Sequence, residues 1–227
     1  MNAVLQYVLY LAVLVVLAVP LGRYIGKVMN GERVFLSRLL VPCENGIYRL
    51  LKVDKDEQMG WKKYAGCALA FSGISLVVLM SIHMLQGVLP LNPEGLSGTS
   101  WHLAFNNAVS FVTNTNWQSY SGESTLSYFT QMMGLTVQNF VSAAVGISVL
   151  FALIRGFLKV KEKGLGSFWA DVTRTTLYVL IPLSLVVSLS LVSQGVVQNF
   201  RPYGSVSLVQ PIKGGGGARR AGRRGPM

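Results

Sequence analysis

The stretch "NNAVSFVTNTNWQSYSGE", residues 106–123, decides how the rest of this sequence is interpreted. It begins as an apolar, helix-like segment and becomes a run of hydroxyl and amide side chains between two long apolar stretches. A bilayer core offers irregular backbone no water, so a loop at membrane depth must be buried in protein or line a water-filled path. Two alternatives follow: a loop that forms part of an ion path, or a simple extracellular loop that is polar because loops are.

The surrounding composition is that of a membrane protein. Of the 227 residues, 51% are hydrophobic and only 13% are charged, which is about half the charged share of a soluble domain. Four stretches approach the roughly 20 apolar residues that cross the hydrocarbon core: residues 3–21, 65–89, 130–154 and 175–192. A fifth, "HLAFNNAVSFVT" (residues 102–113), has a helical pattern but is too short to cross. We therefore predict an all-α integral membrane protein built on a span, a pore helix, a loop and a second span.

These observations predict a definite order of segments along the chain. An N-terminal transmembrane helix (1–21) and a cytoplasmic loop (22–63) precede a first pore repeat (64–154). The repeat contains a transmembrane helix (64–89), a pore helix (102–113), a filter loop (113–122) and a second transmembrane helix (130–154). A cytoplasmic loop (155–174), a transmembrane helix (175–195), an outer segment (196–213) and a Gly/Arg tail (214–227) follow.

The placement of positive charge predicts the orientation of these spans. Residues 21–63 carry nine Lys and Arg against five acidic residues, and residues 155–174 carry five against two. No Lys or Arg lies between Tyr64 and Ile154. Because cytoplasmic loops are enriched in Lys and Arg, both basic segments should face the cytoplasm and the polar loop should face outside. Membrane orientation explains these blocks, and we expect no nucleic-acid partner.

The loop is rich in uncharged oxygen, the material from which potassium filters replace the water around an ion. The short helix should end near the membrane centre, where its C-terminal dipole favours a cation. No carboxylate lies in residues 113–118, which favours a monovalent ion, and Glu123 is expected at the outer rim. Gly122 would permit a backbone turn. The candidate ion ligands are Thr113, Asn114, Thr115, Asn116 and Gln118.

Other polar residues carry weaker signals. Gln138 belongs to a four-residue recurrence of small and polar residues in the following span, and it either lines a cavity or helps the helices to pack. His83 and His102 lack acidic or thiol partners at ligand spacing, so no divalent metal site is expected. Cys43 and Cys67 are interpreted as ordinary thiols. We find no nucleophile–base pair and no nucleotide motif, so the chain itself is not expected to be an enzyme.

The stretch quoted above, followed by "LSYFTQMMGLTVQNFVSAAVGI", closely resembles the first pore region of the KdpA family. "HMLQGVLPLNPEGLSGTSWHLAFN" before it and "FWADVTRTTLYVLIPLSL" after it are similar to the same family. KdpA is the potassium-binding, channel-like subunit of the bacterial Kdp potassium-transporting P-type ATPase. The resemblance covers roughly residues 1–205 and implies a member of the potassium transporter superfamily with an extra N-terminal helix.

The resemblance implies a function and a set of partners. Thr113, Asn114, Thr115 and Asn116 would contribute filter oxygens of the first repeat, and Gln118 would be a potassium-affinity position. Potassium, as the transported ion, would pass to KdpB, the ATP-hydrolysing subunit, with KdpC, KdpF and membrane lipid as further partners. The complex would lie in the bacterial inner membrane as a multi-pass assembly.

The chain also departs from the family pattern, which has four pore loops where this sequence has one. We expect a truncation or a shift of reading frame near residues 205–213, and a fragment that is inactive alone. "GGGGARRAGRRGP" (residues 214–226) is interpreted either as such a frame-shifted or cloning-derived tail or as a disordered segment that binds RNA or lipid. The alternative function is a non-conducting membrane assembly or docking protein, in which the loop only contacts a partner.

Overall fold

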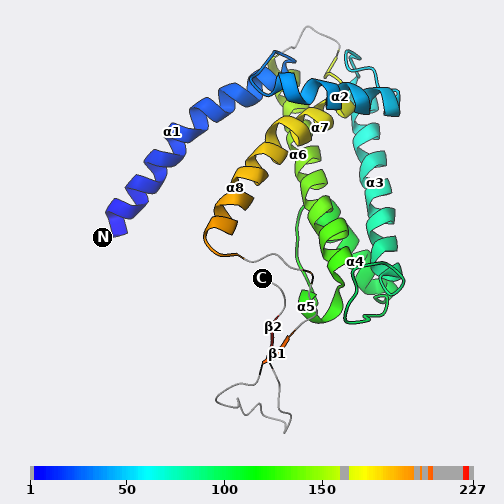
Figure 1. Cartoon of the computed structure of the whole chain (residues 1–227). Helices are drawn as coiled ribbons and strands as arrows, with labels where there is room; N and C mark the ends of the chain where they lie inside the picture. Colours follow the sequence, from blue (N-terminus) through cyan, green and yellow to red (C-terminus); the bar gives the residue numbers. More distant parts are fainter. Residues whose placement is uncertain (1–2, 159–163, 197–199, 201–203, 207–221, 225–227) are drawn as a thin grey trace. The chain divides into compact units, whose positions relative to one another are not determined.

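The computed structural model describes residues 3–158, 164–196, 200, 204–206 and 222–224. It is helical apart from two three-residue strands (Figure 1). The elements are α1 (Ala3–Met29), α2 (Ser37–Leu51), α3 (Trp61–Leu85), α4 (Trp101–Val112), α5 (Gly122–Thr125), the π-helix η1 (Thr130–Thr136), α6 (Val137–Leu158), α7 (Phe168–Arg174), the π-helix η2 (Thr175–Leu180), α8 (Ile181–Ser193), β1 (Gly204–Val206) and β2 (Gly222–Arg224).

Within the described residues, four helical segments are long and apolar enough to cross a membrane, and they coincide with the four stretches predicted as spans. They are Val4–Met29, Trp61–Leu85, Thr130–Leu158 and Phe168–Ser193. The first helix continues eight residues past the predicted end at residue 21, because its basic terminal turns remain helical beyond the apolar run. In the fourth, η2 directly precedes Ile181 and Pro182. A proline lacks the backbone N–H that would donate in an α-helix, so Pro182 explains why the preceding turn is a wider π-helix.

Two predicted loops contain helices. The segment 22–63, predicted as a cytoplasmic loop, holds the whole of α2, and the segment 155–174 holds α7. Most of the predicted outer segment and Gly/Arg tail lies outside the described residues. Of that region the structure describes β1 and β2, which pair antiparallel with Gly204 opposite Arg224.

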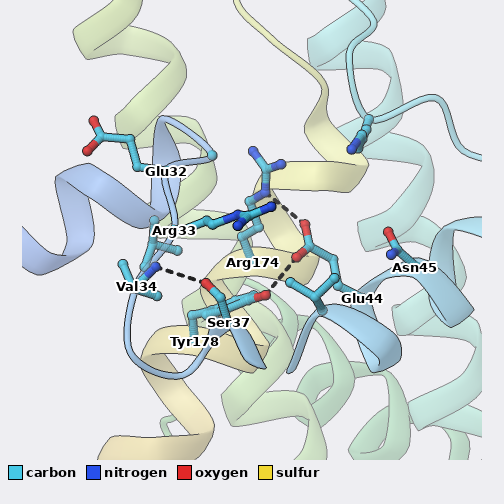
Figure 2. A pocket seen from close by; sticks show the side chains of 12 residues that line it. Glu32, Arg33, Val34, Ser37, Glu44, Asn45, Arg174 and Tyr178 are labelled. Atoms are coloured by element: carbon cyan, nitrogen blue, oxygen red, sulfur yellow. Dashed lines mark hydrogen bonds and ion pairs between the residues drawn. The ribbon is translucent and has the colours of Figure 1, made fainter. Parts of the chain in front are cut away.

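The chain divides into two compact units. The first comprises Met1–Ala68 and Ala144–Ser184. Arg155 connects several segments of this unit. Its guanidinium donates to both carboxylate oxygens of Asp171 (2.6 and 2.8 Å) and to the carbonyls of Leu165 and Met29. A second ion pair joins Arg174 to Glu44 of α2 (Figure 2). Two pairs therefore tie α1, α2, α6 and α7 together.

The second unit comprises Leu69–Ala143 and Leu185–Met227. Its apolar core consists of Leu79, Ala108, Phe111, Leu126 and Leu135, which come from α3, α4, η1 and the segment after α5. Gly134 lets η1 approach α3 closely, because a Cβ at this position would lie 3.1 Å from a terminal carbon of Leu79. This core holds α4 against the far half of α3 (Figure 1) and thereby positions the loop that follows α4.

Candidate functional site

The candidate site begins with α4, which matches the predicted pore helix to within one residue at each end. Ser100 caps its start, with the hydroxyl accepting the Leu103 amide at 3.4 Å. One face of α4 is buried, through Ala104, Asn107, Ala108, Ser110 and Phe111. The helix stops at Val112, and the loop begins there.

The loop turns its amide groups back into the end of α4. The amides of Thr113 and Asn114 donate to the carbonyls of Val109 and Phe111, at 3.0 and 3.2 Å. The amides of Thr115 and Asn116 both donate to the carbonyl of Ser110, at 2.9 and 3.2 Å. The hydroxyl of Ser110 donates in turn to the carbonyl of Trp117 at 2.9 Å. The donors of four successive residues are therefore satisfied inside the protein.

The carbonyl groups of the same residues differ from the amides in their hydrogen bonding. The structure records no hydrogen bond to the carbonyls of residues 113–116 from any residue that it describes, and all four residues are exposed. Asn114 and Asn116 have left-handed backbone, with φ of 56° and 59°, and they alternate with residues of negative φ. Asparagine adopts this conformation more readily than most residues. The result is a short run of backbone that presents oxygen, at the negative end of a helix dipole.

The loop side chains hold one another and connect to α6. The hydroxyls of Thr113 and Thr115 lie 2.8 Å apart. Asn114 accepts a hydrogen bond from Ser142 of α6 at 3.3 Å, and a weak one from Asn116 at 3.4 Å. These contacts link the side chains of Thr113, Asn114, Thr115 and Asn116, whose role as ion ligands stays a prediction. Gln118 is exposed, and the described part of the chain gives it no hydrogen-bond partner.

Gly122 and Gln138, predicted to support the loop, differ in how their structure compares with the prediction. Gly122 does not make a left-handed turn, so that interpretation was wrong: it opens α5, and its carbonyl accepts from Leu126 and Gln131. The left-handed positions are the two asparagines instead. Gln138 is buried on α6, one helical turn before Ser142. Its position is compatible both with cavity lining and with packing, so the alternatives left open by the sequence remain.

Glu123 stands at the edge of the loop, in α5. Its carboxylate accepts from the Ser121 hydroxyl at 2.9 Å. The backbone amide and then this hydroxyl hold the pKa of Glu123 below its ordinary value, so the carboxylate stays ionised near neutral pH. The only charge near the loop on this segment is therefore negative, which suits a cation.

Gln86 braces the loop region from below, a role that the sequence analysis missed. It is fully buried just beyond α3, and its amide donates to the carbonyls of Ser97 and Thr125, at 2.7 and 2.8 Å. Its carbonyl accepts from the Ser127 amide and the Thr130 hydroxyl, at 3.1 and 3.2 Å. A buried glutamine next to a span was the available signal, because polar groups there need partners.

His83 forms a second brace. Its ring nitrogen Nε2 lies 2.8 Å from the side-chain amide of Asn107 on α4, and Asn107 accepts the Tyr120 hydroxyl at 3.2 Å. The three side chains connect α3, the pore helix and the end of the loop. These partners are 24 and 13 residues apart in sequence, so no spacing pattern could indicate them.

The site offers neutral oxygen ligands and no metal cluster. Within the described ranges, no group of three or more His, Cys, Asp or Glu residues is placed to hold a metal ion. Uncharged carbonyl and hydroxyl oxygens are suited to a monovalent cation that must shed and regain its water.

A separate hollow of about 210 Å³ lies in the first unit and is lined by Arg33, Glu44 and Arg174 among others (Figure 2). There Glu44 and Arg174 form an ion pair with each other.

Comparison with known proteins identifies relatives of the chain. The family described as "KdpA: Potassium-transporting ATPase A subunit" matches residues 8–227. A protein of Clostridium botulinum named "Potassium-transporting ATPase potassium-binding subunit" is 76% identical over 212 residues, covering 93% of this chain and 37% of the relative. Proteins of the same name from Desulfovibrio desulfuricans and Listeria welshimeri are 61% identical over 217 residues and 59% identical over 212, covering 96% and 93% of this chain.

The chain spans about 37% of the length of these three relatives. The family match covers nearly all of the sequence, including the four spans and the loop after α4. The resemblance inferred from the pore region is therefore confirmed along most of the chain. The protein is a multi-pass membrane protein that belongs to the KdpA family of potassium-transporting ATPase A subunits.

Proposed function

We propose that this chain is the N-terminal part of the potassium-binding and translocating subunit of an ATP-driven uptake complex. External potassium binds at the oxygens of residues 113–116 and then passes to an ATPase subunit. ATP hydrolysis belongs to that partner, KdpB, and KdpC and KdpF complete the complex in the bacterial inner membrane. The relatives' names support this proposal, because each is called a potassium-binding subunit.

One observation carries the proposal: the loop satisfies its amides and exposes its carbonyls. Each amide of residues 113–116 donates to the last carbonyls of α4, whereas the carbonyls of these exposed residues have no partner among the described residues. Amides that turn back onto the last carbonyls are common where a helix ends, so the proposal depends on the carbonyls of the four exposed residues that follow the helix. A site that replaces the water around potassium needs such carbonyls, because a cation binds oxygen and is repelled by amide hydrogens.

The loop supplies only part of a potassium site. A dehydrated potassium ion requires a ring of oxygens around it, and residues 113–116 form one arc. We propose that three further pore loops of the complete subunit supply the others, in a span–pore helix–loop–span arrangement repeated around one filter. The chain alone is then inactive in transport, and its activity is measurable in a full-length subunit that carries this sequence.

The test uses such a full-length subunit, co-expressed with its ATPase partners in a host that depends on them for potassium. Gln118→Arg places a positive charge beside the exposed carbonyls, so the apparent KM for potassium should rise at least about tenfold by charge repulsion. Gln194→Arg is the matched control, since Gln194 is an exposed glutamine at the end of α8, and it should leave uptake unchanged. Equal uptake in both variants would argue against the loop as an ion site and favour a docking role.

A further inference from the structure

Helix α2 (Ser37–Leu51) exposes large apolar side chains, although another of its leucines, Leu40, packs against the core of the first unit. Leu39 and Leu50 are 71% and 82% exposed, and Cys43 is exposed as well. At 100° per residue these three positions fall on one narrow stripe of the helix. Glu44 and Tyr48 lie on a different face and are 7% and 6% exposed. A helix of a water-soluble domain has the opposite arrangement.

The inward face of α2 is satisfied by the first unit. Glu44 accepts from Arg174 at 2.9 Å and from the hydroxyls of Tyr178 and Tyr48, both at 2.8 Å. Figure 2 shows Glu44 directed toward Arg174 and Tyr178. The one acidic residue of α2 is therefore neutralised inside the unit.

The third face of α2 is basic. Arg38 and Arg49 are exposed and lie on the same side of the helix, close to Asn45. Since Glu44 is engaged, no exposed acid of α2 offsets these two charges. An exposed apolar stripe beside an exposed basic stripe matches an interface between hydrocarbon and anionic headgroups.

The position of α2 in the chain also indicates that it lies at the membrane surface. It connects two candidate spans, one ending at Met29 and the next starting at Trp61, so it lies at one membrane surface. Figure 1 shows it running crosswise to the first turns of α3 rather than along them. Trp61 is 68% exposed at that start and lies beneath the Lys62 ammonium, 5.6 Å from the ring centre. Exposed tryptophan and lysine at a helix end are typical of the headgroup region.

We propose that α2 is an in-plane amphipathic helix that binds anionic phospholipid at the cytoplasmic surface of the membrane. Leu39, Cys43 and Leu50 enter the acyl chains, and Arg38 and Arg49 remain with the lipid phosphates. The site is independent of the potassium loop. Its ligand is the phosphate of a membrane lipid, recognised by charge and by the adjoining hydrocarbon.

The experiment uses the natural Cys43 of the full chain, reconstituted in nanodiscs. A Cys67→Ser background leaves Cys43 as the single thiol for an environment-sensitive fluorophore. Quenching by brominated acyl chains should be at least about threefold stronger at Cys43 than at a label placed by Asn45→Cys in a Cys43→Ser, Cys67→Ser background, because the two positions lie on different faces. Should the Cys67→Ser background not fold, thiol protection of Cys43 can be mapped in the native two-cysteine chain, in detergent and in nanodiscs.

Charge is tested with lipid composition. In nanodiscs containing about a third phosphatidylglycerol, quenching at Cys43 should exceed that in pure phosphatidylcholine, and high salt should remove the excess. The double variant Arg38→Gln, Arg49→Gln should lose the excess without salt.

Three results would overturn the proposal. Equal quenching at positions 43 and 45 would mean that the stripe does not face lipid. A Cys43 label shielded from water but not quenched by brominated lipid would mean that protein covers α2. Quenching independent of phosphatidylglycerol would exclude anionic lipid as the ligand.

Discussion

Asn114 and Asn116 set the direction of the loop carbonyls, because their left-handed backbone alternates with residues of negative φ. From the sequence, backbone freedom was expected at Gly122 instead, since glycine is the residue most often found in such turns. The asparagines were predicted only as sources of ligand oxygen. Residue type alone could not reveal that the conformational role lies at the same positions as the proposed ligands.

A pair of substitutions at Asn116 separates backbone from side chain. Asn116→Gly keeps the left-handed conformation at no steric cost, whereas Asn116→Val opposes it at a cost of about 1–3 kcal/mol. In the full-length complex, we expect Asn116→Val to raise the apparent KM for potassium more than Asn116→Gly does, measured by rubidium or potassium uptake. Equal increases in both variants would show that the Asn116 side chain, which both substitutions remove, is needed rather than its backbone conformation.

At the scale of elements, the spans and the pore helix were predictable because apolar length and helical pattern are local signals. The four spans and α4 agree with the sequence to within a few residues at most ends. Helix α2 was missed because it is shorter than a span, carries charged residues and contains Pro42, so its segment was assigned to a loop between two spans. The braces at His83 and Gln86 were missed because their partners come from other elements, and only the packed fold brings them together.

The junction between α3 and the segment before α4 depends on Gly98. A Cβ at this position would lie within 2.0 Å of the Met84 carbonyl oxygen, so the backbone must move to accept one. We expect Gly98→Ala to lower the free energy of unfolding of the chain in detergent by about 2–3 kcal/mol or more. Gly146→Ala is the control: its Cβ meets nothing within 4 Å in α6, and it should be neutral or stabilising by up to about 1 kcal/mol. Equal melting temperatures for both variants would contradict the close approach.

At the scale of the whole molecule, the two units are held by different chemistry. The first contains the ion pairs Arg155–Asp171 and Arg174–Glu44, and the second is braced by the amide of Gln86. Acid should therefore act on each unit through a different group: through the Glu44 carboxylate in the first and through the buried His83 imidazole in the second, whereas the Gln86 amide does not titrate.

The pH dependence of α2 tests this difference. Burial raises the pKa of the Glu44 carboxyl, but hydrogen bonds from Arg174, Tyr178 and Tyr48 outweigh burial and hold the pKa below its ordinary value of 4.5. Because the folded pKa is the lower one, the stabilisation is complete above the unfolded pKa and is lost as the pH falls through the folded value. Hydrogen exchange of α2 peptides, corrected for intrinsic rates, should accelerate on acidification below pH 4.5. Glu44→Gln should remove that acceleration and should also raise hydrogen exchange in α2 at neutral pH. Glu32→Gln is the control: it changes an exposed carboxylate of the same unit and should keep the wild-type pH profile. If Glu44→Gln retained the acid sensitivity, the charge on α2 would not be what fastens this helix to the first unit.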